Sequence, residues 1–297
     1  MAVSAVIPVK DGEKFIRHAL DSLVQQGPLV DEIIVVNNAS SDATAQIVND
    51  HPDGRIRQIF SDIPNLPLSR NLGAAEATSE WLYFLDADDR VFSGALAKLL
   101  AAAAAHPDAA VVYGDYCRLD ETGNKIGNRR LLPSGRKPTG DILDALLTGN
   151  KMIVGSQIVR RQSFEEAGRF DRSIPFAEDW EFWCRMASQF PFHFVPDLVV
   201  LGYTMHTASM SHHKPLPLSK FEPVLDAIFA NPRLAARSDL ADLRRKAEAG
   251  ALTYISTEAV RIGAHGDAVS AYRRALAADP AKAPLITAKY LGAYIGL

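Results

Sequence analysis

Residues 86–89, Asp-Ala-Asp-Asp, place three carboxylates within four positions, directly after the apolar run 81–85. That run is typical of a buried strand, and ligands bind in open α/β sheets where such strands end. Clustered carboxylates repel one another unless a cation or a hydrogen-bonded ligand offsets their charge. Their hard oxygen atoms suit Mg²⁺ or Mn²⁺, commonly with a diphosphate sharing the ion. A simpler explanation is open at this point: Asp89 or Ser93 caps a helix expected over residues 94–105.

Two earlier strand ends also carry groups that could hold a ligand. The first expected strand breaks at Pro8 and Gly12, which would let backbone groups approach a flat ligand, although an ordinary turn has the same composition. Asn37 and Asn38 follow the apolar run 33–36. Amide side chains can bind a base edge by donating and accepting hydrogen bonds, and an Asx turn before a helix explains them equally well.

Glu178 and Asp179 begin an expected helix that carries three large aromatic residues among positions 180–183. An acid between bulky aromatic side chains is partly desolvated, which raises its pKa and suits it to act as a general base. The alternative is that these acids only stabilise the positive end of the helix dipole. Arg70 lies on an earlier expected helix, where it could clamp a diphosphate or be an ordinary surface arginine.

Strands and helices alternate in the first third of the chain. Strands are expected over residues 3–9, 32–37, 56–61 and 81–85. Helices are expected over residues 15–26, 41–48, with Ser41 or Asp42 as its cap, and 68–77. Such alternation predicts a largely parallel sheet covered by helices on both faces, so the polar strand ends would meet at one edge.

The rest of the chain has a different pattern. Further strands are expected over residues 111–119, 156–159 and 192–200, with helices over 164–168 and 178–189. Residues 125–150 are basic and turn-rich, as in a mobile loop. Helices 241–262 and 266–278 follow; the second resembles part of a tetratricopeptide repeat, but a solenoid needs about three repeats. We therefore expect a catalytic domain over residues 1–213 and a helical appendage over 214–297.

Composition limits the class of protein. Hydrophobic residues make up 47% and charged residues 23% of the chain, which is ordinary for a folded soluble domain. A net charge of −3 gives no reason to expect a nucleic-acid partner. Cys117 and Cys184 are isolated and fit a reducing, cytoplasmic compartment. We find no signal peptide or membrane span; residues 283–297, with Lys289, leave peripheral contact with the inner face of a membrane open, and self-association is open too.

The ordered motifs resemble the family 2 glycosyltransferases of the GT-A fold over residues 3–211. Each motif alone is weak evidence for the family, whereas the ordered set is specific to it. The motifs are VIPV (6–9), residues 22–26, DEIIVVNNASSD (31–42), SRNLG (69–73), FLDADD (84–89), GRFD (168–171) and EDW (178–180). The resemblance implies an α/β GT-A fold, a Rossmann-like and mostly parallel mixed sheet with helices on both faces, followed by the helical appendage.

The resemblance also implies inverting transfer of a single sugar from a nucleotide-diphosphate sugar to a glycan, lipid-linked or other hydroxyl acceptor, in polysaccharide or glycoconjugate synthesis. Asp179 would be the catalytic base, and Asp88 would bind Mn²⁺ or Mg²⁺. His206, in the late segment 201–206, would be a second metal ligand or, with equal weight, a surface histidine. The donor would contact Pro8, Val9, Asn38, Arg70, Asp86, Ala87 and Glu178.

The chain departs from the family at a few positions. Asn37 and Asn38 stand where the family commonly has an acid, and Asp11 and Thr204 replace a usual Asn and Arg, so base preference is open. The Gln-x-x-Arg-Trp signature of processive synthases is missing, which favours a single transfer. A nucleotidyltransferase, which is another alternative, would normally need a Gly-rich triphosphate loop near the N-terminus, and residues 9–12 are a poor match to one. A dehydrogenase would need G-x-G-x-x-G after the first strand, and this motif is missing. A non-catalytic nucleotide-sugar-binding module is a further alternative.

Overall fold

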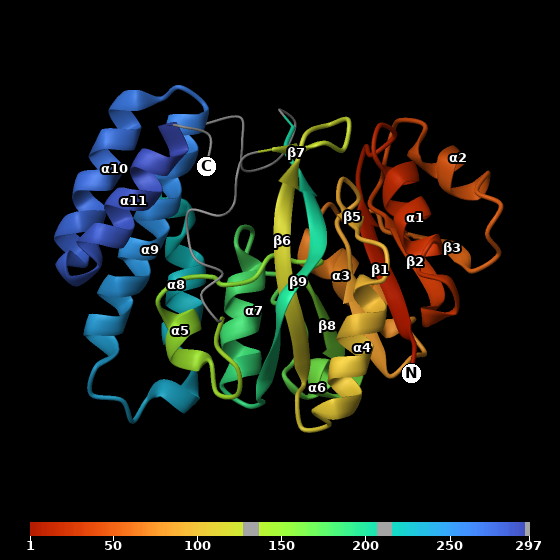
Figure 1. The fold of residues 1–297 in the computed structure, drawn as a ribbon, viewed down its shortest axis with the longest axis horizontal. Coiled ribbons are helices and arrows are strands. Elements are labelled where there is room, and N and C mark those ends of the chain that lie inside the picture. The colour runs from red at the N-terminus through yellow and green to blue at the C-terminus, as the bar shows by residue number, and fades with distance from the viewer. Residues whose placement is uncertain (127–136, 207–215, 295–297) are drawn as a thin grey trace.

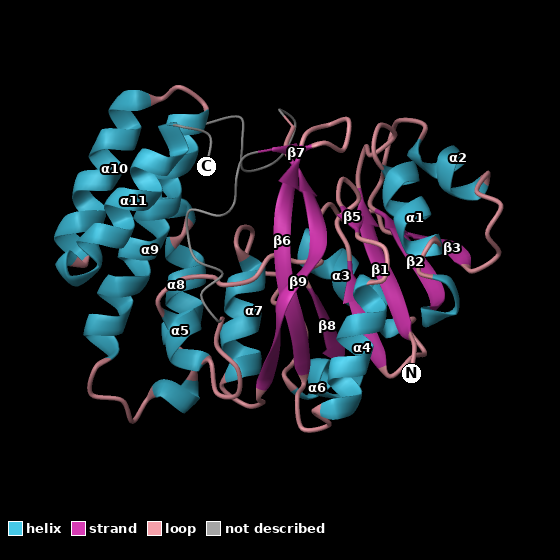
Figure 2. Cartoon of the chain, in the orientation of Figure 1, coloured by secondary structure: helices cyan, strands magenta, loops and turns pink. Residues whose placement is uncertain are grey.

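The computed structural model describes residues 1–126, 137–206 and 216–294. One mixed sheet runs through its centre (Figure 2). Its strand order is β3 (Ile56–Phe60), β2 (Val30–Asn37), β1 (Val3–Val9), β4 (Trp81–Phe84), β8 (Gln157–Arg160), β6 (Val111–Leu119), β9 (Phe192–Thr204) and β5 (Arg90–Val91), with β7 (Lys125–Ile126) paired to β6. The first four are parallel neighbours, whereas β8 is antiparallel to both β4 and β6. This confirms a parallel first half and a mixed second half.

Helices cover both faces of the sheet, as the alternation predicted. Every residue of β1 is buried, and alternate side chains enter opposite cores because a strand has a period of two. Ile7 packs with α1 (Ile16–Val24) and α4 (Ala95–Ala105), and Val6 packs on the other side. The helices of that second side are α3 (Leu66–Ala75), α5 (Leu143–Leu147), α6 (Arg161–Glu166) and α7 (Glu178–Ala187). The short helix α2 (Thr44–Asn49) follows β2.

The C-terminal helices share a core with the sheet. They are α8 (Glu222–Phe229), α9 (Leu240–Arg261), α10 (His265–Ala278) and α11 (Ala283–Tyr294). Trp183 of α7 belongs to the same buried cluster as Val224 and Ala251, and α8 and α9 stand beside α5 and α7 in Figure 1. A Cβ at Gly250 would lie 2.8 Å from the Thr148 carbonyl oxygen, so this glycine allows α9 to approach the segment after α5.

Some expectations about organisation fall in or near the undescribed ranges. The expected mobile loop over 125–150 contains α5, and its residues 127–136 lie outside the described part of the chain. The boundary predicted between residues 213 and 214 also lies outside it, so the two-part division stays a prediction. Within the described ranges, no helix combines the length and apolarity needed to cross a bilayer.

Candidate active site

The carboxyl ends of β1, β2 and β4 lie at one edge of the sheet because these strands are parallel neighbours. The loops after β1 and β2 are joined by hydrogen bonds. The Asn38 amide donates to the Val9 carbonyl oxygen over 2.7 Å, and the Ser41 amide donates to the Asp11 carboxylate over 2.7 Å. Asp11 and Ala39 take positive φ angles of 49° and 53°, which allow both loops to turn sharply. Pro8 and Val9 are buried beneath them.

The Asn38 side chain is buried among groups of the protein itself. With its amide group facing the Ile63 carbonyl oxygen at 2.6 Å, its oxygen accepts from the Asn65 amide at 3.1 Å. The side-chain amide of Asn37 donates to the side-chain oxygen of Gln58 over 2.9 Å. These amides therefore hold the edge loops in place, and contact between Asn38 and a base stays a prediction.

Asp88 and His206 meet although they are 118 residues apart. The Asp88 Oδ2 atom lies 2.8 Å from His206 Nε2, and the ring of His206 packs 4.6 Å from the ring of Phe15. The other ring nitrogen of His206 is buried and has no partner among the described residues. Neighbouring ligands of an octahedral ion lie ~3 Å apart, and the Asp88 carboxylate is the kind of oxygen ligand that suits Mn²⁺ or Mg²⁺, whereas imidazole is a more usual ligand of zinc, copper, iron and nickel. The carboxylate therefore fits such an ion, and a metal role for His206 stays a prediction; the described residues contain no cluster of three metal-ligand side chains.

Asp89 does not cap the following helix, so that expectation is wrong. Helix α4 begins after Gly94, which has a φ of 72°, and no side chain caps it. The intervening strand β5 pairs with β9 and turns Asp89 inward, where its Oδ1 atom accepts a 2.8 Å hydrogen bond from the Thr204 amide. Ser93 makes no cap either. Burial raises the pKa of Asp89 well above its ordinary value. Asp89 is therefore a buried structural carboxyl group next to Asp88.

Arg70 joins the strand-end acids to helix α7. It is 2% exposed; one guanidinium nitrogen donates to Asp86 over 2.8 Å and another pairs with Glu178. Burial alone would lower the pKa of Arg70, but the two carboxylates outweigh this and raise the pKa. Gly73, one turn later, lets α3 lie against β1, since a Cβ there would be 2.3 Å from Val6. The guanidinium thus holds two protein carboxylates, and a diphosphate contact stays a prediction.

Asp179, the candidate base, is a half-buried acid next to Glu178 on α7. Its carboxylate accepts 2.9 Å hydrogen bonds from the Asn150 side chain and from the Trp180 amide. Burial and the neighbouring charge of Glu178 raise the pKa of Asp179 to about 7, against the opposing charge of Arg70. A carboxylate with such a pKa can accept a proton near neutral pH. Asn150 escaped sequence reasoning because its residue type and loop position carried no signal.

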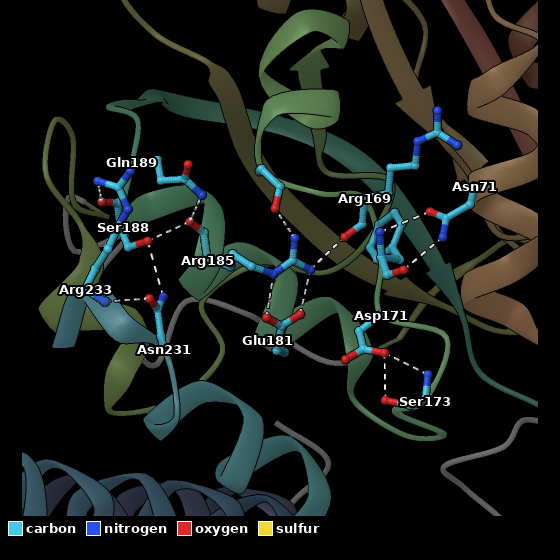
Figure 3. A network of polar contacts seen from close by, with 12 residues as sticks. Asn71, Arg169, Asp171, Ser173, Glu181, Arg185, Ser188, Gln189, Asn231 and Arg233 are labelled. Carbon is cyan, nitrogen blue, oxygen red and sulfur yellow. Dashed lines mark hydrogen bonds and ion pairs between the residues drawn. The ribbon is translucent and has the colours of Figure 1, made fainter. Parts of the chain in front are cut away.

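The loop over residues 167–173 holds α7 against α3 (Figure 3). The Asn71 side chain exchanges two hydrogen bonds with the backbone of Phe170, at 2.8 and 3.0 Å. Arg185 binds both carboxylate oxygens of Glu181, at 2.7 and 2.8 Å, and donates to the Arg169 carbonyl oxygen over 2.6 Å. The helices that carry Arg70 and Asp179 are therefore tied to the same loop.

Comparisons with known proteins identify the family and the fold. The sequence model named Glycosyl transferase family 2 matches residues 4–168, more than half of the chain. The chain belongs to glycosyl transferase family 2. This family 2 chain is 32% identical over 190 residues to the uncharacterized glycosyltransferase EpsJ of Bacillus subtilis, covering 61% of the chain and 54% of EpsJ.

Another relative of this family 2 chain is an uncharacterized glycosyltransferase of Rickettsia conorii, 25% identical over 203 residues, covering 67% of the chain and 33% of the relative. The chain thus spans about a third to a half of the length of these curated relatives. A crystal structure of S. aureus TarS 1-349 in complex with UDP-GlcNAc has a TM-score of 0.69 at 17% identity, covering 99% of this chain and 89% of that one. This likeness confirms the GT-A-like fold.

Proposed function

We propose that the chain is an inverting glycosyltransferase that moves one sugar from a nucleotide-diphosphate sugar to a hydroxyl acceptor, in polysaccharide or glycoconjugate synthesis. Family membership supports the reaction class. The observation that carries the proposal is Asp179, whose pKa is raised to about 7 and which is linked to the strand-end acids through Glu178 and Arg70. The proposed proton acceptor lies on helix α7, whereas the acids suited to the leaving group follow strand β4.

In the proposed reaction, the acceptor oxygen attacks the anomeric carbon from the face opposite the diphosphate. The Asp179 carboxylate takes the hydroxyl proton as the new bond forms and the bond to the diphosphate breaks. Asn150 holds the Asp179 carboxylate in one orientation. General-base catalysis of this kind typically contributes ~10²–10⁴ in rate.

The donor would lie over the edge formed by Val9, Asn38 and Asp86. A solved TarS structure in complex with UDP and another with UDP-GlcNAc share this fold. They support a nucleoside diphosphate as the part of the donor that the protein binds. Asp88 and His206 would hold Mn²⁺ or Mg²⁺, and such an ion supplies Lewis-acid neutralisation of the charge on the departing diphosphate.

The test is a thermal-shift screen of nucleoside diphosphates with and without Mn²⁺, followed by turnover of the matching nucleotide sugars. We expect one base to raise Tm, because a ligand that binds only the folded state stabilises it. We also expect release of the diphosphate from the corresponding sugar donor. Binding without turnover of any donor would favour the non-catalytic module, and a requirement for a nucleoside triphosphate would favour a nucleotidyltransferase.

A further inference from the structure

Helix α11 carries apolar residues on all its sides, yet only one side is covered by the rest of the described chain. Ile286, Tyr290 and Ala293 are buried and recur at the spacing of one helix face. Leu285 and Leu291 lie on the other side, where they are 41% and 56% exposed. A helix that is hydrophobic all round is normally buried all round, so the outward face of α11 is unusual for a surface in contact with water.

Exposed hydrophobic side chains are concentrated on this helix. Of the eight large hydrophobic side chains that are exposed in the described part of the chain, three belong to α11: Leu285, Leu291 and Tyr294. Pro284 and Ala288 are exposed as well. Positions 284, 288 and 291 share one face because they are three or four residues apart. The outward face is thus an apolar strip of Pro284, Leu285, Ala288 and Leu291, and contiguous exposed patches of this kind mark interaction sites.

The charged side chains exposed on α10 and α11 after the first turn of α10 are all cations. Residues 268–294 contain a single acid, Asp279, which is 3% exposed. They contain four cations, which are Arg273, Arg274, Lys282 and Lys289. Lys282 lies 3.7 Å from Asp279, and the other three are exposed. The whole chain has a net charge of −3, so this stretch forms a positive surface on an acidic protein.

Cations from both helices lie beside the apolar strip. Lys289 lies one turn after Leu285 on α11. On α10, the ring of Tyr272 stacks on the ring of Tyr290 at 4.3 Å, so the side of α10 that carries Tyr272 lies against α11. The exposed Arg273 follows Tyr272 directly. An apolar centre with cations at its borders is complementary to a surface that is apolar inside and negatively charged outside.

We propose that the outward face of α11 docks the protein on an anionic lipid surface. The apolar strip would enter the boundary between headgroups and acyl chains, while Arg273 and Lys289 would contact lipid phosphates. Interfacial helices bind through these two contributions together. A second copy of the chain is a poorer occupant, because a two-fold contact through this face would bring the same cations together. The inference does not depend on the proposed sugar transfer.

The direct test is flotation of the full chain with lipid vesicles. The vesicles contain phosphatidylcholine alone, or phosphatidylcholine with one third replaced by phosphatidylglycerol, each at low and at high salt. We expect binding to the anionic vesicles at low salt, and weaker binding at high salt because ions screen the charges. Phosphatidylcholine alone should bind the protein less than the anionic mixture does. A protein that stays unbound with anionic vesicles at low salt would overturn the proposal.

Substitutions on α11 test whether this face makes the contact. Leu291→Ser should weaken binding to anionic vesicles about fivefold through lost apolar burial, and Lys289→Gln about fivefold through the lost charge. Phe60→Ser is the control for the first, because Phe60 is 66% exposed at the end of β3, at the other end of the molecule from α10 and α11 (Figure 1). Lys98→Gln, at an exposed lysine on α4, is the control for the second. Equal binding by the wild type and all four variants would refute docking through α11.

Two further outcomes separate the possible occupants and the two proposals. Gel filtration that shows a dimer disrupted by Leu291→Ser, in a protein that does not bind vesicles, would assign the face to a second copy and overturn the lipid proposal. Vesicle binding that depends on Leu291 and Lys289, in a protein that turns over no nucleotide sugar, would uphold the lipid proposal and count against the proposed function alone.

Discussion

The leaving-group end and the base end of the site are built in different ways. At the leaving-group end, Asp86 and Asp88 follow one strand, so the parallel topology of the sheet places them at the edge. At the base end, Asp179 depends on Asn150, and Glu178 depends on Arg70, which are 29 and 108 residues away. Arg70 is the one residue described above that contacts both ends. The acids of the first end come from a single strand end, with His206 joining them from 118 residues away, whereas both acids of the second end depend on distant partners.

The largest effect should come from Asp179→Asn, because asparagine keeps the shape but cannot take a proton. We expect turnover to fall ~10²–10⁴-fold while nucleoside diphosphate affinity is unchanged. Steady-state kinetics and calorimetry measure the two quantities. Asp197→Asn, which neutralises an exposed acid at a positive φ of 58°, is the control. Loss of diphosphate affinity in Asp179→Asn would mean that the two ends are not separate.

Arg70→Gln breaks the connection between the ends. It leaves Asp86 and Glu178 as partly buried acids without their cation, and breaking a buried pair costs about 3–5 kcal/mol of unfolding free energy. Arg57→Gln is the matched control, because Arg57 pairs with Glu32 and Glu76 while 38% exposed, and such surface pairs contribute about 1 kcal/mol or less. Denaturant unfolding at pH 7 compares them. Similar losses in both variants would show that Arg70 does not join the ends.

Asp88→Asn should affect the leaving-group end alone. Removing a ligand should weaken the Mn²⁺-dependent part of nucleoside diphosphate binding by at least ~10-fold, since even residues that only support metal ligands cost this much. Calorimetry with and without Mn²⁺ measures the difference, and His206→Gln should act in the same direction. If Mn²⁺ strengthens diphosphate binding equally in Asp88→Asn and the wild type, Asp88 is not a ligand.

Glu178→Gln should give the smallest effect, a shift in pH dependence. Glutamine removes the like charge that helps to raise the pKa of Asp179 but keeps an oxygen for Arg70. The pKa of Asp179 should fall, so activity should persist to a lower pH, by about one unit or less. The pH dependence of kcat/KM between pH 5 and 9 tests this. A shift toward higher pH would contradict the electrostatic link between Glu178 and Asp179.

The same contrast explains what the sequence could reveal. Strand positions, the helices on both faces and the acids at the strand ends follow from local periodicity. The aromatic neighbours drew attention to Glu178 and Asp179, and the family motifs singled out Asp179. Capping by Asp89, one of the alternatives that the sequence left open, proved wrong because its partner, Thr204, is 115 residues away on β9. The contacts of Arg70 with Glu178 and of Asn150 with Asp179 depend on tertiary packing, for which hydrophobic patterning carries no signal.

The central claim is that Asp179 is a base with a pKa raised by burial and by Glu178, and the pH dependence of kcat/KM in the wild type tests it most directly. A base must be deprotonated to act, so activity should be lost as pH falls through the folded-state pKa of about 7. We predict a plateau above that pH and a decline of about tenfold per unit below it. A kcat/KM that stays constant from pH 8 down to pH 5 would contradict the account.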